Sequence, residues 1–335
     1  MNTHELPMIL FTVIAQMSVG TFLVLGVIDV AVMRGRFKDS ATRVVEPVLY
    51  AIGPALVLGL LVSMLHMNDI TNVFNVFRHW NSSWLSREII FGVAFAALGF
   101  ATAIVTWLRA GSVALRRVLS AVTALAGIAL VWAMSQIYYS VVTIPAWHTA
   151  IVPLHFFGTT IILGALAVGS ALMVTAAIRA RNEPKPATKT TTKPAPTSGF
   201  AAMVKGRIAE INAPTSADEW ALTTSIVRWI AVVTAIAGLV ILLSYPVHIA
   251  DLAQGNATAQ AAAAVFSGGF FIARMVLLAI SAILLAFFAF STARNTLRER
   301  PGWLVTLMVS AFVLAAIAEI MGRSLHYDSM LRIGI

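Results

Sequence analysis

The sequence predicts an all-α membrane protein, a bundle of eight transmembrane helices with both termini on the extracytoplasmic side. Of the 335 residues 59% are hydrophobic and only 11% are charged, and the apolar residues fall in long runs. A helix needs about 20 apolar residues to span a bilayer, and runs rich in Ala, Leu and Gly do not alternate like barrel strands. The eight runs are Pro7–Met33, Val44–Met67, Ser86–Leu108, Leu115–Ser140, Ile151–Ile178, Thr223–Ala250, Ser267–Thr292 and Gly302–Arg323.

The first run is predicted to be a membrane-spanning helix rather than a cleavable signal. Met1–Leu6 contains no Lys or Arg, whereas a secretory signal begins with a basic segment. The run is also longer than a signal core, and it is followed by Arg34, Arg36, Lys38 and Arg43. This order predicts a helix inserted with its N-terminus outside.

The connections between the runs alternate in basic charge. Those after the first, third, fifth and seventh runs contain 17 Lys and Arg residues, whereas the other connections and the termini contain four. Since cytoplasmic loops are enriched in Lys and Arg, both termini are predicted to be periplasmic, in a multi-pass protein of a bacterial inner membrane. The net charge of +9 then belongs to the loops, so we expect the lipid bilayer and no nucleic acid as a partner.

The fifth connection is the only long one. Its sequence at 181–198, RNEPKPATKTTTKPAPTS, has no apolar anchor and predicts a flexible cytoplasmic linker. Lys205–Trp220 is predicted to form a short interfacial helix. The protein therefore divides into helices one to five at 1–178, a Pro-, Thr- and Lys-rich linker segment at 179–222, and helices six to eight at 223–335.

Cysteine is absent, which excludes disulfides and cysteine-ligated zinc or iron–sulfur clusters within this chain. The predicted topology places all seven histidines at or beyond the extracytoplasmic edge. A pair of haems stacked across the membrane needs ligands at two depths, so such a pair is excluded, while one haem near the outer face stays open. The histidines are His4, His66, His79, His148, His155, His248 and His326.

Other ionisable residues gather at the same edge, although a charge inside a membrane costs about 2.5–3.5 kcal/mol. Glu88 has a structural alternative, because a carboxylate is favoured in the first turn of a helix. Glu319 and Arg323 are four residues apart, which favours an ion pair. Arg274 lies inside a run and needs a partner or a cavity. Together these residues predict a polar pocket open to the outer leaflet.

Such a pocket suits the oxidation of a quinol, which needs an apolar slot and acceptors for two protons. His66 and Glu88 are candidates for the acceptors, since histidine titrates near neutral pH and partial burial makes a carboxylate more basic. Without a cysteine cluster or a haem pair in this chain, the electron acceptor is expected on another subunit. Trp80, Trp84 and Trp147 are most simply explained as an aromatic belt.

At these residues the sequence resembles the membrane anchor subunit of bacterial dimethyl sulfoxide reductase, within the polysulfide-reductase-type eight-helix quinone subunits. No single segment is diagnostic, but together they are fairly specific and span nearly the whole chain. The segments are Glu5–Thr12 with Gln16, Ser63–His66, Ser86–Ile89, Trp132 through Ile144–Trp147, Arg274–Leu278 and Glu319–Arg323.

The resemblance implies a menaquinol-oxidising anchor with an iron–sulfur electron-transfer subunit and a molybdopterin catalytic subunit as partners. It implies that His66 and Glu88 are the catalytic, quinol-interacting residues, and it makes Arg274, Glu319 and Arg323 further candidates for binding the quinone. It places the clusters and molybdopterin in the partner subunits, with no haem in this chain. The quinol is expected between helices two, three, seven and eight.

Two other classes of function remain open. A transporter would show polar residues at mid-depth, broken helices or inverted repeats, and the only hints are Gly53–Pro54 and Gly268–Gly269. A cytochrome b-type anchor would use the outer-face haem.

Overall fold

The computed structural model describes residues 6–32, 37–64, 76–181, 199–294 and 301–333. Over these ranges the protein is helical without strands, as predicted. The helices are α1 (Leu6–Val32), α2 (Lys38–Met64), α3 (Trp84–Trp107), α4 (Val113–Tyr139), α5 (Ile151–Arg181), α6 (Phe200–Asn212), α7 (Ala217–Ala253), α8 (Ala257–Val265), α9 (Gly269–Arg294) and α10 (Pro301–Asp328).

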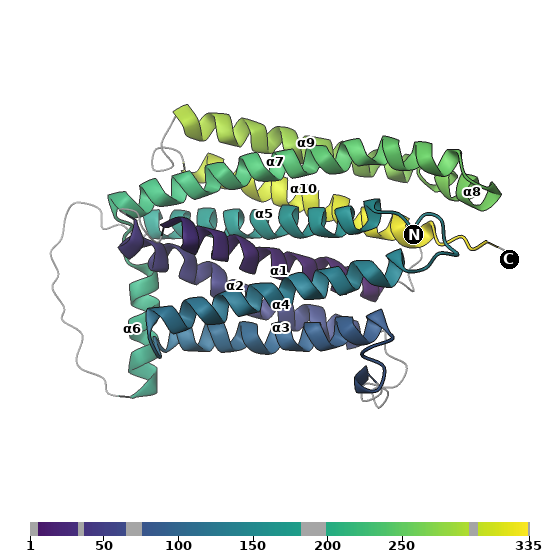
Figure 1. The fold of residues 1–335 in the computed structure, drawn as a ribbon. Helices are drawn as coiled ribbons and strands as arrows, with labels where there is room; N and C mark the ends of the chain where they lie inside the picture. Colours follow the sequence, from purple (N-terminus) through teal and green to yellow (C-terminus); the bar gives the residue numbers. More distant parts are fainter. Residues whose placement is uncertain (1–5, 33–36, 65–75, 182–198, 295–300, 334–335) are drawn as a thin grey trace.

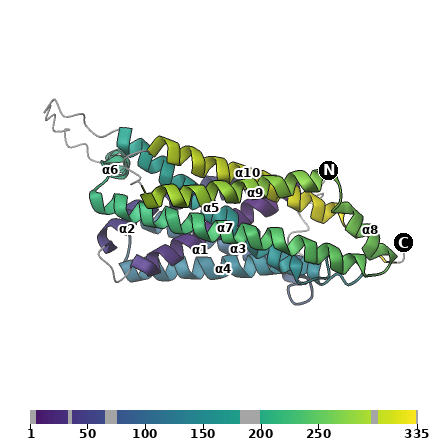
Figure 2. The ribbon, with the colours of Figure 1, turned by 90° about the horizontal axis from the view of Figure 1, so that it is seen from above.

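The long helices lie side by side along one axis, while α6 crosses one end of the bundle and α8 lies at the other end (Figures 1 and 2). Within the described part of the chain, seven helices are long and apolar enough to span a membrane: α1, α3, α4, α5, α7, α9 and α10. These helices confirm a helical membrane protein. The eighth span, for which the 27-residue α2 is the candidate, and the side of each terminus stay predictions.

α1 lies at the centre of the bundle, packed against α5, α2 and α4, while α7, α9 and α10 continue the bundle on the other side of α5. The crossing of α1 and α5 is close because two glycines meet there. A Cβ on Gly164 would lie 2.6 Å from the backbone nitrogen of Thr21, and a Cβ on Gly20 would lie 2.9 Å from Cα of Gly164. Small residues allow this approach in membranes, where packing rather than the hydrophobic effect joins helices.

A short helix forms in the segment where an interfacial helix is predicted, but the predicted range, Lys205–Trp220, is wrong. The helix α6 begins and ends earlier, because a capping box at Ser216 starts a new helix. The Ser216 hydroxyl accepts from the Glu219 backbone, and the Glu219 carboxylate accepts from the Ser216 backbone, so two free amide groups are satisfied. Trp220 therefore belongs to α7, which starts at Ala217 rather than at Thr223. Residues 182–198 of the predicted flexible linker lie outside the described residues.

Buried arginines attach α6 to the end of the bundle. Arg207 donates to Glu46 of α2 at 3.1 Å and to Glu210 at 2.8 Å, with only 7% of Arg207 exposed. Arg179 of α5 donates to the backbone carbonyl of Ile211 at 2.7 Å. The hydrogen bond from Arg207 lowers the pKa of Glu210, so Glu210 is charged at neutral pH.

Candidate functional site

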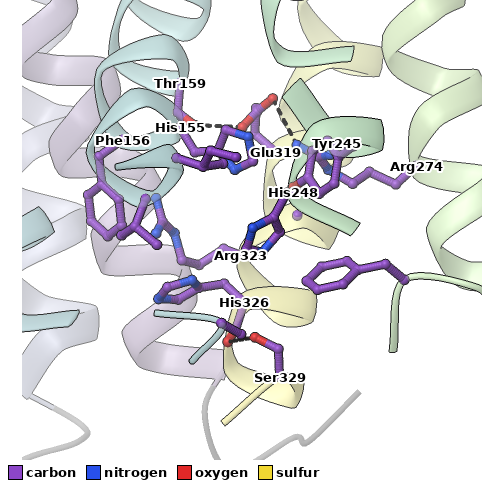
Figure 3. Close-up of a pocket in the computed structure, with 15 residues that line it drawn as sticks. His155, Phe156, Thr159, Tyr245, His248, Arg274, Glu319, Arg323, His326 and Ser329 are labelled. Carbon is purple, nitrogen blue, oxygen red and sulfur yellow. Dashed lines mark hydrogen bonds and ion pairs between the residues drawn. The ribbon is translucent and has the colours of Figure 1, made fainter. Parts of the chain in front are cut away.

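A small polar cavity lies at the end of the bundle opposite α6, enclosed by α5, α7, α9 and α10 (Figure 3). Its volume is about 30 Å³, which is room for ordered water but not for a quinol ring. Four helices, α5, α7, α9 and α10, place charged or histidine side chains in it, although each of these helices is largely apolar. The lining residues are Ala146, Ile151, Val152, His155, Phe156, Thr159, Tyr245, His248, Phe266, Arg274, Glu319, Gly322, Arg323, His326 and Ser329.

Arg274 enters the cavity from the N-terminal part of α9 and is 2% exposed. Its Nε donates to the backbone carbonyl of Ala318 at 3.1 Å, and its Nη2 lies 3.7 Å from Oε1 of Glu319. The guanidinium carbon also lies 4.4 Å from the centre of the Tyr245 ring, in a cation–π contact. Arg274 thus has the partner that an arginine inside a membrane span requires.

Gly322 provides the space that Arg274 occupies. A Cβ at Gly322 would lie 2.7 Å from Nη2 and 2.8 Å from Cζ of Arg274. Because real side chains essentially never approach so closely, any larger residue here must displace the guanidinium. The position of the Arg274 guanidinium on α9 therefore depends on the absence of a side chain at Gly322 on α10.

The predicted ion pair between Glu319 and Arg323 is wrong. Glu319 instead pairs with Arg274 and accepts a hydrogen bond from Thr159 at 2.6 Å. Arg323 turns toward α1, where its Nη2 donates to Oε1 of Gln16 at 3.1 Å. Its guanidinium carbon lies 3.7 Å from the centre of the Phe156 ring. The spacing along α10 allowed the pair, but neighbouring helices offer both residues other partners.

Three histidines, His155, His248 and His326, line the cavity, although the sequence does not single them out as a group. His155 donates from Nε2 to Ser244 at 2.7 Å, since the Ser244 hydroxyl itself donates to the Ile241 carbonyl. His248 comes from α7 and is 4% exposed, and His326 comes from α10. The available signal was the predicted position that they share at the extracytoplasmic edge. In the described part of the chain, no group of His, Asp and Glu side chains suits a metal ion.

His326 is held by aromatic rings. It stacks on Trp147 with the ring centres 5.1 Å apart, and Tyr138 meets it edge-on at 4.6 Å. The Trp147 indole donates to the His326 carbonyl at 2.8 Å. Trp147 is 7% exposed, so its predicted place in an aromatic belt is wrong, because the connection before α5 folds it back onto α10. Trp80 is 61% exposed and remains a belt candidate.

The two predicted catalytic residues lie apart from this cavity or outside the described residues. Glu88 belongs to α3, is 8% exposed and does not line the cavity. It interacts electrostatically with Arg323 and with Tyr138, which shares a 2.6 Å hydrogen bond with Tyr327. His66 lies outside the described residues. The structure thus brings together three residues of the predicted site, Arg274, Glu319 and Arg323, around the cavity. Glu88 interacts with Arg323 from outside the cavity.

Comparisons with known proteins point to one family. Residues 1–189 match the family described as DMSO reductase anchor subunit (DmsC). Over 163 residues the protein is 32% identical to the C subunit of the anaerobic dimethyl sulfoxide reductase of Escherichia coli, a match to 49% of this protein and 56% of that one. It is 32% identical over 176 residues to the corresponding subunit of Haemophilus influenzae, a match to 52% and 61%. The matched region spans little more than half the length of these relatives.

Proposed function

The chain belongs to the family of DMSO reductase anchor subunits (DmsC), and from this premise we propose that it anchors a reductase in the bacterial inner membrane and oxidises menaquinol for it. Two electrons pass to an iron–sulfur subunit and then to a molybdopterin subunit. That subunit reduces dimethyl sulfoxide or a related S- or N-oxide. The names of the relatives, which are subunits of anaerobic dimethyl sulfoxide reductases, support this assignment.

One structural observation carries the proposal for quinol chemistry. Glu88, Arg323 and Arg274 are buried in apolar helices at the same end of the bundle. Buried charges inside a membrane are costly and mark a functional site by default. A quinol losing two protons and two electrons needs nearby bases and fixed positive charge, and this end of the bundle holds both.

We assign Glu88 as the acceptor of one quinol proton and His66 as the hydrogen-bonding partner of a quinol hydroxyl. Arg323 lines the cavity and interacts electrostatically with Glu88, and its charge stabilises the electron-rich quinol oxygen as protons leave. Arg274 and Glu319, which also line the cavity, hold each other in place through their ion pair. The quinol ring itself binds outside the 30 Å³ cavity, since the cavity is too small for it.

The test compares two electron donors for the assembled complex in membranes. Glu88→Gln keeps the shape of the side chain but removes the base, so menaquinol-driven reduction of dimethyl sulfoxide should fall by about 100-fold or more. Reduction driven by a soluble dye, which delivers electrons directly to the partner subunits, should stay unchanged. His66→Arg should have the same effect.

Glu46→Gln is the matched control, because Glu46 is an equally buried carboxylate at the opposite end, paired with Arg207. It should retain quinol-driven turnover wherever the complex assembles. Full quinol-driven turnover in Glu88→Gln would contradict the assignment of Glu88. Absence of quinol-driven turnover in the wild-type complex, with dye-driven turnover intact, would contradict the proposed function.

A further inference from the structure

Three buried polar atoms in the cavity lack a hydrogen-bond partner in the structure as described. They are Nδ1 of His248, Oε1 of Glu319 and Nε2 of His326. The residues come from two helices, and His248 and Glu319 are each only 4% exposed. An unsatisfied buried polar group costs about 1–3 kcal/mol. Native proteins satisfy such groups with ordered water where a polar cavity provides the space.

The cavity has the size and lining for such water. Its volume of about 30 Å³ exceeds the space that a single water needs. Glu319 and His326 are seven residues apart on α10, which is about 10 Å along a helix. Two or three waters at hydrogen-bond spacing cover that distance. Ser329, whose hydroxyl donates to the His326 carbonyl at 2.8 Å, is the next lining residue toward the C-terminus.

We propose that this cavity holds a chain of ordered waters that carries one proton of the quinol oxidation to the extracytoplasmic surface, with His326 as its outer relay. The inference rests on the proposed function. The quinol loses two electrons, which reduce the iron–sulfur subunit, and two protons. One proton passes to Glu88 and the other enters the water chain, hops to Nε2 of His326 and leaves beyond Ser329.

The charges around the cavity suit a relay that does not store a cation. Arg274 from α9 and Arg323 from α10 oppose a free excess proton, and Glu319 compensates one of them. His155 from α5 already uses Nε2 in its bond to Ser244. His248 from α7 and His326 have ring nitrogens free for water. A proton therefore crosses by successive transfers between neutral acceptors, each of which returns to its starting form.

His326→Phe tests the relay in the assembled complex. Phenylalanine keeps a ring to stack on Trp147 but removes Nε2, so quinol-driven turnover should fall about tenfold or more. The KM for menaquinol should remain unchanged, and the solvent isotope effect in D₂O should rise. His148→Phe is the matched control, because His148 stacks on Tyr139 but does not line the cavity. It should behave like the wild type.

Wild-type turnover and isotope effect in His326→Phe would overturn the relay while leaving quinol oxidation by the wild-type protein intact. A rise in the KM alone, without a change in turnover, would also overturn it. By contrast, a wild-type complex without quinol-driven turnover would contradict the proposed function itself. The two failures are therefore distinguishable in one set of assays.

The water can be tested without any turnover. Radicals generated from water by a short X-ray pulse oxidise side chains that contact bound water even when they are buried. Phe266, which lines the cavity and is 6% exposed, should be oxidised in the purified protein. Phe95, which is 0% exposed and does not line it, should not. Equal protection of both rings would overturn the proposed water chain.

Discussion

Gly322 and Arg274 show, at the scale of single residues, how a helix can accommodate a buried charge. Replacing Gly322 by Ala would place a Cβ 2.7 Å from Nη2 of Arg274 and so push the guanidinium away from Glu319. Overpacking of this kind costs about 1–3 kcal/mol. We expect Gly322→Ala to lower the thermal unfolding midpoint of the purified protein and to slow quinol-driven turnover.

Gly302→Ala provides the control for that measurement. Gly302 also belongs to α10, and a Cβ there would meet nothing within 4 Å. The thermal unfolding midpoint of Gly302→Ala should equal or exceed that of the wild type, because Ala is a better helix former than Gly. If both substitutions left the midpoint unchanged, Gly322 would not be needed to accommodate Arg274.

At this scale the sequence predicted which residues meet but not how they pair. The cost of charge in a membrane was enough to select Arg274, Glu319 and Arg323, and the structure brings them into one cavity. Their partners depend on other helices: Thr159 holds Glu319, and Gln16 holds Arg323. Spacing along one helix carries no information about such contacts. The roles of His66 and Glu88 remain predictions.

At the scale of elements, α6 depends on one buried ion pair more than on its own sequence. A 13-residue helix is marginal alone in water, and Arg207 joins it to Glu46 of α2. Arg207→Ala leaves Glu46 buried without its partner, which typically costs about 3–5 kcal/mol. We expect hydrogen exchange to accelerate over 200–212 and around Glu46, while the rest of the bundle stays protected.

The neighbouring Lys205 provides the control, since it lies exposed on the same helix. Lys205→Ala should leave hydrogen exchange over 200–212 unchanged. Equal exchange in the wild type and in Arg207→Ala would show that α6 is held by other contacts.

The limits of α6 could not be predicted from hydropathy alone. Within a polar segment that lies between two apolar runs, hydropathy does not change at the ends of a helix and so cannot locate them. The decisive signal was the pair Ser216 and Glu219, whose spacing matches a capping box. The short helix α8 was missed for a similar reason: its start depends on one cap, in which Asn256 accepts from the Ala259 backbone.

At the scale of the whole molecule, the orientation of the bundle is open to a simple measurement, because the sequence has no cysteine. Ala209 on α6 and Gln260 on α8 are exposed and lie at opposite ends of the bundle (Figure 1). In intact cells, a membrane-impermeant maleimide given access to the periplasm should label Gln260→Cys. It should label Ala209→Cys only after the inner membrane is opened.

The cysteine-free parent protein gives the background of the labelling experiment. The reverse pattern would mean that the bundle is inserted the other way round. Long apolar runs predicted the seven helices of the described part that are long and apolar enough to span a membrane, because the bilayer demands both length and apolarity. In α2, Glu46 and two prolines lower the apolar signal, so the eighth span stays a prediction.

The close crossing of α1 and α5 also limits how early during synthesis α1 can reach its native packing. Roughly 120 residues separate the end of α1 at Val32 from the start of α5 at Ile151, which a ribosome adds in about 6–24 seconds. During that time the Gly20 surface and the Gln16 amide of α1 lack the partners that α5 and α10 supply. α1 is therefore made well before it reaches its native surroundings.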